Sequence, residues 1–338
     1  MPAPIWLSGR LEMHKKGLSQ ARREMLHRLI IGIGPRAVLA VSLSIAAAAG
    51  AEAALPVVEV AAGVYVHFGL QEDFSRSNLG TIANIGFIRG ARCVAVIDTG
   101  GSIAVGRALR EAVKAVTDLP VCYVINTHVH PDHIFGNAAF KQDQPIFVGH
   151  HRLPAAMAAR GQHYLNALTR DLGGITAGSA VIPPQLTVKD TWELDLGGRI
   201  VKLRAWPTAH TDNDLTVYDE QTQTLWLSDL LFIDHIPVVD GSLKGWLSVL
   251  KELQGMRPRH VIAGHGKATT AWPGAIETQQ RYLDTLLRET RLAIRRKQTI
   301  QQAVDGVGYS ERGKWLMFDL FHRRNVTAAF AELEWEDD

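Results

Sequence analysis

From residue 56 onward, short apolar runs alternate with amphipathic stretches along the chain. Apolar runs bounded by Gly, Pro or polar residues are typical of strands, whereas apolar residues spaced three and four apart are typical of helices. The pattern predicts strands at residues 63–67, 84–88, 93–97, 120–126, 146–148, 200–205, 215–218, 224–227 and 261–262. It predicts helices at residues 102–117, 153–172, 245–255 and 275–297. Interleaved strands and helices, with no linker or repeat, indicate one layered α/β domain over residues 56–338, C-terminal helices included.

Composition narrows the class of protein. The 338 residues are 46% hydrophobic and 21% charged, which excludes a disordered or fibrous chain. Two cysteines exclude a disulfide-rich scaffold, a Cys-based zinc module and a C-x-x-C-H haem attachment site. Cys93 and Cys122 lie on predicted neighbouring strands, and we expect buried free thiols there rather than a disulfide. The net charge of +2 gives no reason to expect nucleic acid as a partner.

The first 53 residues have the pattern of an export signal. Seven basic residues and three acidic ones precede or flank an apolar run at residues 37–50, so the rest of the chain carries a net charge of −2. The run is shorter than the roughly 20 residues that span a bilayer, and Ala51-Glu52-Ala53 is an A-x-A cleavage site. We therefore predict a signal peptide cleaved after Ala53, with an uncleaved anchor as the alternative. Arg22-Arg23 leaves Sec and twin-arginine export both open. Either route predicts a periplasmic or secreted protein, with no transmembrane segment after the leader.

A cluster of metal-ligand side chains follows the predicted strand at residues 120–126. His128, His130, Asp132 and His133 fall within six positions. Such side chains cannot all face one way on a helix or a strand, but a turn at the end of a strand lets them converge. Imidazole and carboxylate ligands suit Zn²⁺ or a similar ion. The spacing therefore indicates ligands for two nearby metals.

Three later residues of the same kind also follow predicted strands. His210 comes after the strand at residues 200–205, Asp229 lies just past the strand at residues 224–227, and His265 follows the strand at residues 261–262. Residues just past strand ends are the usual place for active sites in α/β folds. Together with the first cluster, they complete two metal sites.

In order and type, these seven residues resemble the dinuclear motif of the metallo-β-lactamase fold superfamily. The resemblance implies an αββα sandwich with a single hydrolase domain. It implies one metal on His128, His130 and His210, a second on Asp132, His133 and His265, and Asp229 as the bridge. Asp98 matches the superfamily's aspartate that supports the metal loop. Asp rather than Cys at position 229 looks more like the glyoxalase II-like branch, and His130 argues against the di-iron flavoprotein branch.

A narrower resemblance covers most of the chain after the leader. It is similar to the quinoprotein relay system zinc metallohydrolases, which are exported proteins associated with PQQ-type alcohol dehydrogenase systems. The resemblance rests on residues 82–87, 149–154, 158–161, 209–215, 237–246 and 324–335. It implies a quinoprotein dehydrogenase as the candidate protein partner, but it supplies no reaction.

These observations predict a periplasmic hydrolase with two Zn²⁺ per chain. A metal-bridging hydroxide would attack a small carbonyl substrate, namely an ester, thioester, lactone or amide, and Asp132 would orient that hydroxide or carry its proton. One alternative is a non-catalytic accessory or cofactor-handling partner of a quinoprotein dehydrogenase. Another is β-lactamase or glyoxalase II-like activity.

Two further residues are candidates for supporting roles. Asp214 could hydrogen-bond the ligand His210 from outside the metal site, with local turn formation as the equal alternative. His235 lies just beyond Asp229 and could contact substrate or serve structure alone.

Overall fold

The computed structural model of the protein describes residues 53–269 and 271–336. The predicted leader, apart from Ala53, lies outside the described residues. Within the described part of the chain, no helix is both long and apolar enough to cross a bilayer.

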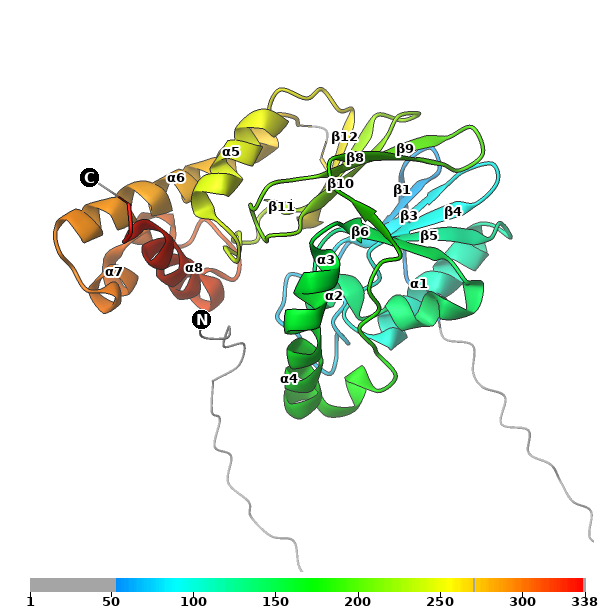
Figure 1. The fold of residues 1–338 in the computed structure, drawn as a ribbon, viewed down its shortest axis with the longest axis horizontal. Coiled ribbons are helices and arrows are strands. Elements are labelled where there is room, and N and C mark those ends of the chain that lie inside the picture. The colour runs from blue at the N-terminus through cyan, green and yellow to red at the C-terminus, as the bar shows by residue number, and fades with distance from the viewer. Residues whose placement is uncertain (1–52, 270, 337–338) are drawn as a thin grey trace, which may run out of the picture. The chain divides into compact units, whose positions relative to one another are not determined.

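The described residues form two sheets that lie face to face (Figure 1). The first has its strands in chain order: β1 (Val58–Ala61), β2 (Val64–His67), β3 (Ile85–Arg89), β4 (Val94–Ile97), β5 (Val121–Asn126), β6 (Ile146–His150) and β7 (Leu186–Val188). Its strands pair antiparallel from β1 to β4 and parallel from β4 to β7. The parallel part therefore directs the carboxyl ends of β4, β5 and β6 to one edge.

The second sheet begins with an antiparallel meander. It contains β8 (Thr191–Asp195), β9 (Ile200–Ala205), β10 (Leu215–Asp219), β11 (Thr224–Phe232) and β12 (His260–His265), in the order β12-β11-β10-β9-β8. β12 pairs parallel with β11, so the two strands end at the same edge.

Helices lie outside both sheets. They are α1 (Ile103–Val116), α2 (Pro131–Ile134), α3 (Leu153–Ala156), α4 (Gln162–Leu172), α5 (Leu243–Leu253), α6 (Gly274–Arg295), α7 (Ile300–Gly306) and α8 (Phe318–Leu333). Short 3₁₀ turns cover Asn137–Asp143, Gly173–Thr176 and Tyr309–Glu311. A π-helical stretch at Met157–Gly161 joins α3 to α4, so residues 153–172 are helical throughout, as predicted, but not α-helical throughout.

The core has one layer between the sheets and another under the first group of helices. Val148, Leu203 and Trp226 are among the buried side chains that fill the space between the sheets. On the outer face of the first sheet, α1 packs Val105 and Leu109 against the strands.

On the outer face of the second sheet, Trp246 of α5 and Gln279 of α6 both donate to the backbone carbonyl of Leu230 in β11. Figure 1 shows α5 to α8 grouped beyond β11. With α1 on one outer face and α5 and α6 on the other, the predicted αββα sandwich is confirmed.

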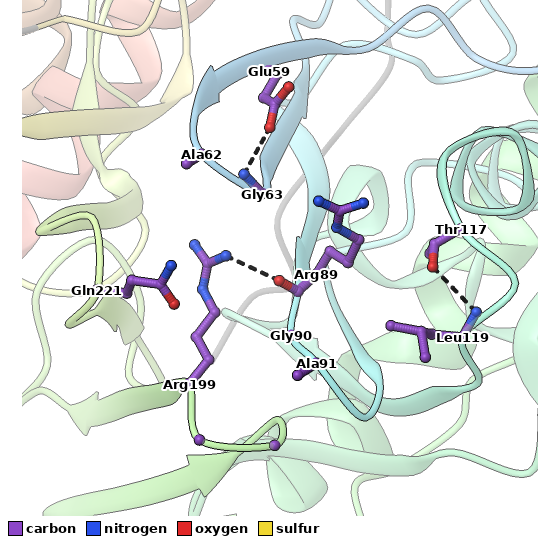
Figure 2. A pocket seen from close by; sticks show the side chains of 12 residues that line it. Glu59, Ala62, Gly63, Arg89, Gly90, Ala91, Thr117, Leu119, Arg199 and Gln221 are labelled. Carbon is purple, nitrogen blue, oxygen red and sulfur yellow. Dashed lines mark hydrogen bonds between the residues drawn. The ribbon is translucent and has the colours of Figure 1, made fainter.

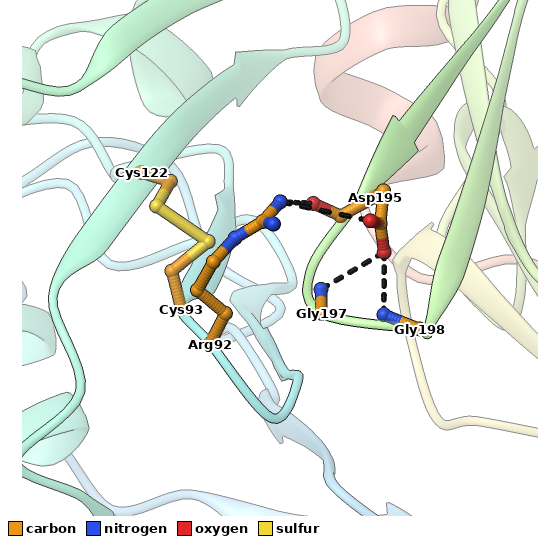
Figure 3. Close-up of a disulfide and its surroundings, with 6 residues drawn as sticks. All are labelled: Arg92, Cys93, Cys122, Asp195, Gly197 and Gly198. Carbon is orange, nitrogen blue, oxygen red and sulfur yellow. Dashed lines mark hydrogen bonds and ion pairs between the residues drawn. A yellow bond between two sulfur atoms is a disulfide. The ribbon is translucent and has the colours of Figure 1, made fainter.

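The prediction of free thiols is wrong. Cys93 and Cys122 form a disulfide, with Cα atoms 5.8 Å apart (Figure 3). They lie where the parallel strands β4 and β5 begin, and both face the core between the sheets. The pairing slips by one residue after Val94 and Val121, at the position of Cys122. This irregularity brings the two sulfurs together, and it leaves no mark on the hydrophobic pattern.

Candidate metal centre

The ligand loop starts where β5 ends, and one buried carboxylate bonds residues at both of its ends. Asp98, just past the neighbouring strand β4, accepts hydrogen bonds from the backbone N–H of Thr127 at 2.8 Å and from its hydroxyl at 2.7 Å. The same carboxylate lies 2.8 Å from Nδ1 of His133. Burial raises the pKa of Asp98, while the His133 imidazole and the Thr127 bonds oppose that shift. Asp98 thus fixes both ends of the loop, as the resemblance implies for its position.

The first group of candidate ligands consists of His128, His130, His210 and Asp229. One donor atom from each lies within 4.8 Å of the others. Nε2 of His128 and Nε2 of His210 are both 3.1 Å from Nδ1 of His130. All four side chains are buried, with at most 5% of any residue exposed.

The second group consists of Asp132, His133 and His265, again with donor atoms within 4.8 Å of one another. Oδ2 of Asp132 is 3.6 Å from Nε2 of His133 and 3.5 Å from Nε2 of His265. The two groups share the edge at which β5, β11 and β12 end. The structure therefore brings together all seven ligands predicted from sequence.

Asp229 lies between the two groups. Its Oδ1 is 3.3 Å from Nε2 of His133, and its Oδ2 is 3.3 Å from Nε2 of His210 and 3.5 Å from Nε2 of His265. One carboxylate therefore faces ligands of both groups, which is the position that a bridging ligand requires.

The backbone around Asp229 differs from the prediction. β11 continues to Phe232, so Asp229 lies within a strand rather than at its end. Ser228 has a φ of +49°, and the pairing with β12 shifts on both sides of it. Opposite it, Gly264 leaves room, because a Cβ there would collide with Oδ1 of Asp229. The strand irregularity and the glycine together let a mid-strand carboxylate enter the site.

The electrostatics of the cluster favour an ionised carboxylate at Asp229 and a neutral imidazole at His128. Burial alone would raise the pKa of Asp229, but His133, His265 and His128 hold it well below its usual range. Burial and the neighbouring His133 put the pKa of His128 well below its usual value. For His133 itself, burial is outweighed by Asp229, Asp132 and Asp98, so its pKa is raised. A cation bound there would displace that proton.

The residues fit a pair of metal ions. Among the described residues, Nε2 of His133 and Oδ1 of Asp229 are buried without a hydrogen-bond partner. The outward nitrogens of three imidazoles are held: His133 by Asp98, His210 by the carbonyl of Val238 at 2.7 Å, and His130 by Asp240 at 3.0 Å. Such outer bonds orient an imidazole so that its other nitrogen can ligate a metal.

The two supporting candidates have different surroundings. The ring of His235 lies 5.0 Å from that of His265, and its Nδ1 donates to the carbonyl of Ile236 at 2.6 Å. Burial, with the nearby His265, lowers the pKa of His235 to about 4. Asp214 instead accepts from the backbone and hydroxyl of Thr211, which favours turn formation over a bond to His210. Burial raises the pKa of Asp214 to about 6.

Sequence reasoning missed a second carboxylate beside the centre. Asp240 accepts from Nη2 of Arg324 at 2.7 Å and Nη1 of Arg160 at 3.3 Å, in addition to its contact with His130. Burial would raise the pKa of Asp240, but His130, Arg324 and Arg160 hold it below its usual range. His130, Arg160 and Arg324 all lie far from Asp240 in the sequence. The available signal was that Arg160, Asp240 and Arg324 each lie in a segment that carries the narrower resemblance.

A family model described as the metallo-beta-lactamase superfamily matches residues 79–265, which is more than half of the chain. The chain belongs to the metallo-beta-lactamase superfamily. The matched range contains all seven candidate ligands and Asp98, and it ends before α6.

Three known proteins resemble the chain in sequence or in structure. The chain is 22% identical over 235 residues to a linear primary-alkylsulfatase of Pseudomonas sp. (strain ATCC 19151), covering 59% of this chain but only 43% of that protein. A metallo-beta-lactamase from Pontibacter korlensis matches with a TM-score of 0.54 and 18% identity, over 68% of this chain and 99% of that one. The stereoselective inverting sec-alkylsulfatase Pisa1 from Pseudomonas sp. matches with a TM-score of 0.64 and 16% identity, over 83% of this chain and 51% of that one. At these identities the structural matches show a shared fold.

A pocket of about 450 Å³ lies away from the metal centre (Figure 2). Turns between strands line it, including those at residues 62–63, 90–91 and 197–198. These turns lie at the opposite ends of the strands from the ligands. Arg199 in this pocket is engaged by Asp219 at 2.8 and 2.7 Å and by the carbonyl of Arg89 at 2.9 Å. Turns of both sheets therefore line the pocket, and none of its lining residues is a candidate metal ligand.

Proposed function

We propose that this protein is a periplasmic or secreted dinuclear zinc hydrolase that acts on a small ester, thioester, lactone or amide. The observation that carries the proposal is the Asp229 carboxylate, which lies between two groups of His and Asp side chains on a metallo-beta-lactamase fold. Bound metal ions would supply Lewis acidity and a water molecule acidic enough to react near neutral pH.

The chain's own residues would orient that chemistry. Asp132 lies within 3.6 Å of two imidazole nitrogens, so its carboxylate can hold the attacking water and accept its proton. Asp98 keeps the loop that carries Asp132 in place through Thr127 and His133. His235, beside His265, is our candidate for a substrate contact near the second group of ligands, with a purely structural role as the alternative. No Ser or Cys nucleophile is required.

The location and the partner rest on the sequence pattern. The basic and apolar leader supports export, by the Sec or the twin-arginine route, with cleavage after Ala53. The narrower resemblance to the quinoprotein relay system zinc metallohydrolases supports association with a quinoprotein (PQQ) dehydrogenase. A non-catalytic accessory or cofactor-handling role for such a dehydrogenase is the alternative, and an intact set of seven ligands favours hydrolysis over it.

Sulfate esters are a second candidate substrate class. A linear primary-alkylsulfatase matches the chain in sequence, and a sec-alkylsulfatase matches 83% of it in structure. Hydrolysis of an alkyl sulfate would use the same activated water. β-Lactamase and glyoxalase II-like activities belong to the same test, because each predicts a different substrate.

The experiment is a substrate panel on the purified zinc-loaded protein. The panel contains thioesters, lactones, aryl esters, alkyl sulfates and a chromogenic cephalosporin, and each is also assayed with Asp132→Ala. We expect turnover on one class and a loss of at least 100-fold in kcat for Asp132→Ala, assayed with enough added Zn²⁺ to fill both ligand groups. A variant that keeps its metals and full turnover would refute the role of Asp132. No turnover on any class would favour the accessory role.

A further inference from the structure

Two metal ligands take their outer hydrogen bonds from one short segment, residues 237–240. The carbonyl of Val238 accepts from Nδ1 of His210 at 2.7 Å. Oδ2 of Asp240 lies 3.0 Å from Nε2 of His130. Both histidines belong to the first group of ligands. The position of this segment therefore determines how two imidazoles of the same group are oriented.

The segment is held in turn by two consecutive residues of α8. Nη2 of Arg324 donates to Oδ1 of Asp240 at 2.7 Å. Asn325 accepts from the backbone N–H of Val239 at 2.9 Å and donates to the carbonyl of Pro237 at 2.7 Å. Asn325 is fully buried. The side-chain amide of Asn325 thus bonds the segment on both sides of Val238.

The same helix also holds the residues that follow the segment. Glu332 accepts from the hydroxyl of Ser242 at 2.7 Å and from the backbone N–H of Leu243 at 2.6 Å, at the start of α5. Residues 237–243 therefore rest along α8 through side chains at positions 324, 325 and 332. This helix lies outside residues 79–265, the range that matches the superfamily.

We propose that α8 supports the metal centre and that Arg324 and Asn325 are positioning residues. They hold residues 237–240, and this segment orients His130 and His210. In this way the two residues set the affinity of the first ligand group for its metal. An outer hydrogen bond fixes both the ring orientation and the tautomer of a ligating histidine. Removing such a partner typically weakens metal binding 10- to 100-fold. In the second group, His133 takes its outer bond from Asp98, and none of the bonds described above joins α8 to that group, so the effect should be confined to one metal.

The test is metal binding by the metal-free full-length protein, measured with Zn²⁺ in competition with a chromophoric chelator. Arg324→Gln and Asn325→Leu remove the bonds to the segment. Arg323→Gln is the matched control, because Arg323 precedes them on the same helix and pairs with Asp305 at the surface. We expect one of two binding steps to weaken 10- to 100-fold in each variant. The other step, and both steps of the control, should stay as in the original protein.

A second readout separates positioning from general loss of structure. In the metal-free protein, ¹⁵N resonances of the histidine rings report whether each ring nitrogen carries a proton. This pattern should change for His130 and His210 in the variants, whereas that of His133 should not. Unchanged binding in Arg324→Gln would overturn the proposal, and so would equal weakening of both steps. If Asn325→Leu does not fold, Arg324→Gln alone decides. Since no substrate is used, this outcome is independent of whether the protein hydrolyses any member of the panel.

Discussion

Asp98 shows how one buried side chain can bond both ends of a ligand loop. It is fully buried, and it takes two hydrogen bonds from Thr127, one from His133 and a longer one from Ser228 at 3.5 Å. Thr127 and His133 belong to the ligand loop, so the carboxylate replaces the water that would otherwise solvate these groups. Removing one partner of a buried charged network leaves the others unpaired, and this costs more than an exposed contact does.

We therefore expect Asp98→Ala to lower the free energy of unfolding of the metal-free protein by about 3 kcal/mol. Asp98→Asn should lose less, because its amide oxygen can still accept from Thr127. Urea unfolding in the presence of a chelator measures both. The account of the loop would be wrong if Asp98→Ala unfolded at the same urea concentration as the original protein.

Gly264 is a residue whose importance lies in what it lacks. A methyl group at this position would collide with Asp229, which faces both ligand groups. Gly306, in α7, has no atom within 4 Å of the same added methyl and serves as the matched control.

Gly264→Ala should therefore reduce metal content below two ions per chain and destabilise the fold by about 1–3 kcal/mol. Gly306→Ala should retain both metals and leave stability unchanged or slightly raised, since alanine is the better helix former. Elemental analysis after gel filtration measures the metals. Full metal content in Gly264→Ala would show that the fit around Asp229 is looser than the structure indicates.

At the residue scale, spacing was enough to predict which side chains converge but not what supports them. His128 to His133 lie within six positions, and each later ligand follows or lies in a strand whose apolar pattern is visible. Asp240 meets His130 across 110 positions and Arg324 across 84. Such contacts depend on how α8 packs, which no local pattern specifies.

At the scale of elements, the buried strands and the long helices before α8 could be predicted, whereas the exposed strands and the bounds of α8 could not. Every residue of β4 and β11 is buried, and the apolar runs that predicted them, at residues 94–97 and 225–227, are unbroken. β8 buries only one of its five residues and β7 is three residues long, so neither gives a clear period. The disulfide was missed because it depends on a slip in strand pairing.

Reduction of Cys93–Cys122 tests what this bond contributes to the sheet. The bond closes a loop of 29 positions, for which chain entropy predicts about 3–4 kcal/mol of stabilisation. The double variant Cys93→Ser/Cys122→Ser should lose about that amount in urea unfolding. It should keep its metals, because the bond lies at the start of β4 and β5 and the ligands lie beyond their ends. Metal loss in a folded variant would contradict this separation.

The ion pair beside the disulfide supplies a control. Arg92 and Asp195 link the β3–β4 and β8–β9 turns at 3.7 Å, but both side chains are about half exposed (Figure 3). Exposed pairs contribute roughly 0–1 kcal/mol. Arg92→Ala should therefore change stability far less than loss of the disulfide.

The C-terminal helices carry a group whose effect depends on pH. Glu311 is buried and accepts from Arg281 of α6, from Lys314 and from Trp315. Burial would raise the pKa of Glu311, but these partners outweigh it and lower the pKa below the ordinary 4.5. A lowered folded-state pKa stabilises the protein above the ordinary value, and this contribution is lost as pH falls below it.

Glu311→Gln should therefore be less stable than the original protein by about 1–2 kcal/mol at pH 7, and the gap should narrow at pH 4. Urea unfolding of the two metal-free proteins at both values measures it. A gap of the same size at pH 4 would mean that the charge of Glu311 does not matter and that packing alone explains the loss.

At the scale of the whole molecule, the superfamily match ends at residue 265, although the structure continues into helices that contact the site. Through residues 237–243, α8 reaches two ligands of the first group. Helix α8 therefore supports residues beside the metal centre as well as lying next to the sandwich. The leader and the dehydrogenase partner stay predictions from sequence.

The central claim is that the two ligand groups bind two metals that act together in hydrolysis. The most direct measurement is to add Zn²⁺ stepwise to the metal-free protein and to follow bound zinc and turnover of the best panel substrate in the same samples. We predict saturation at two zinc per chain, turnover that follows occupancy, and loss of turnover by at least 100-fold in His128→Ala. Full turnover without zinc, or in His128→Ala, would contradict the account.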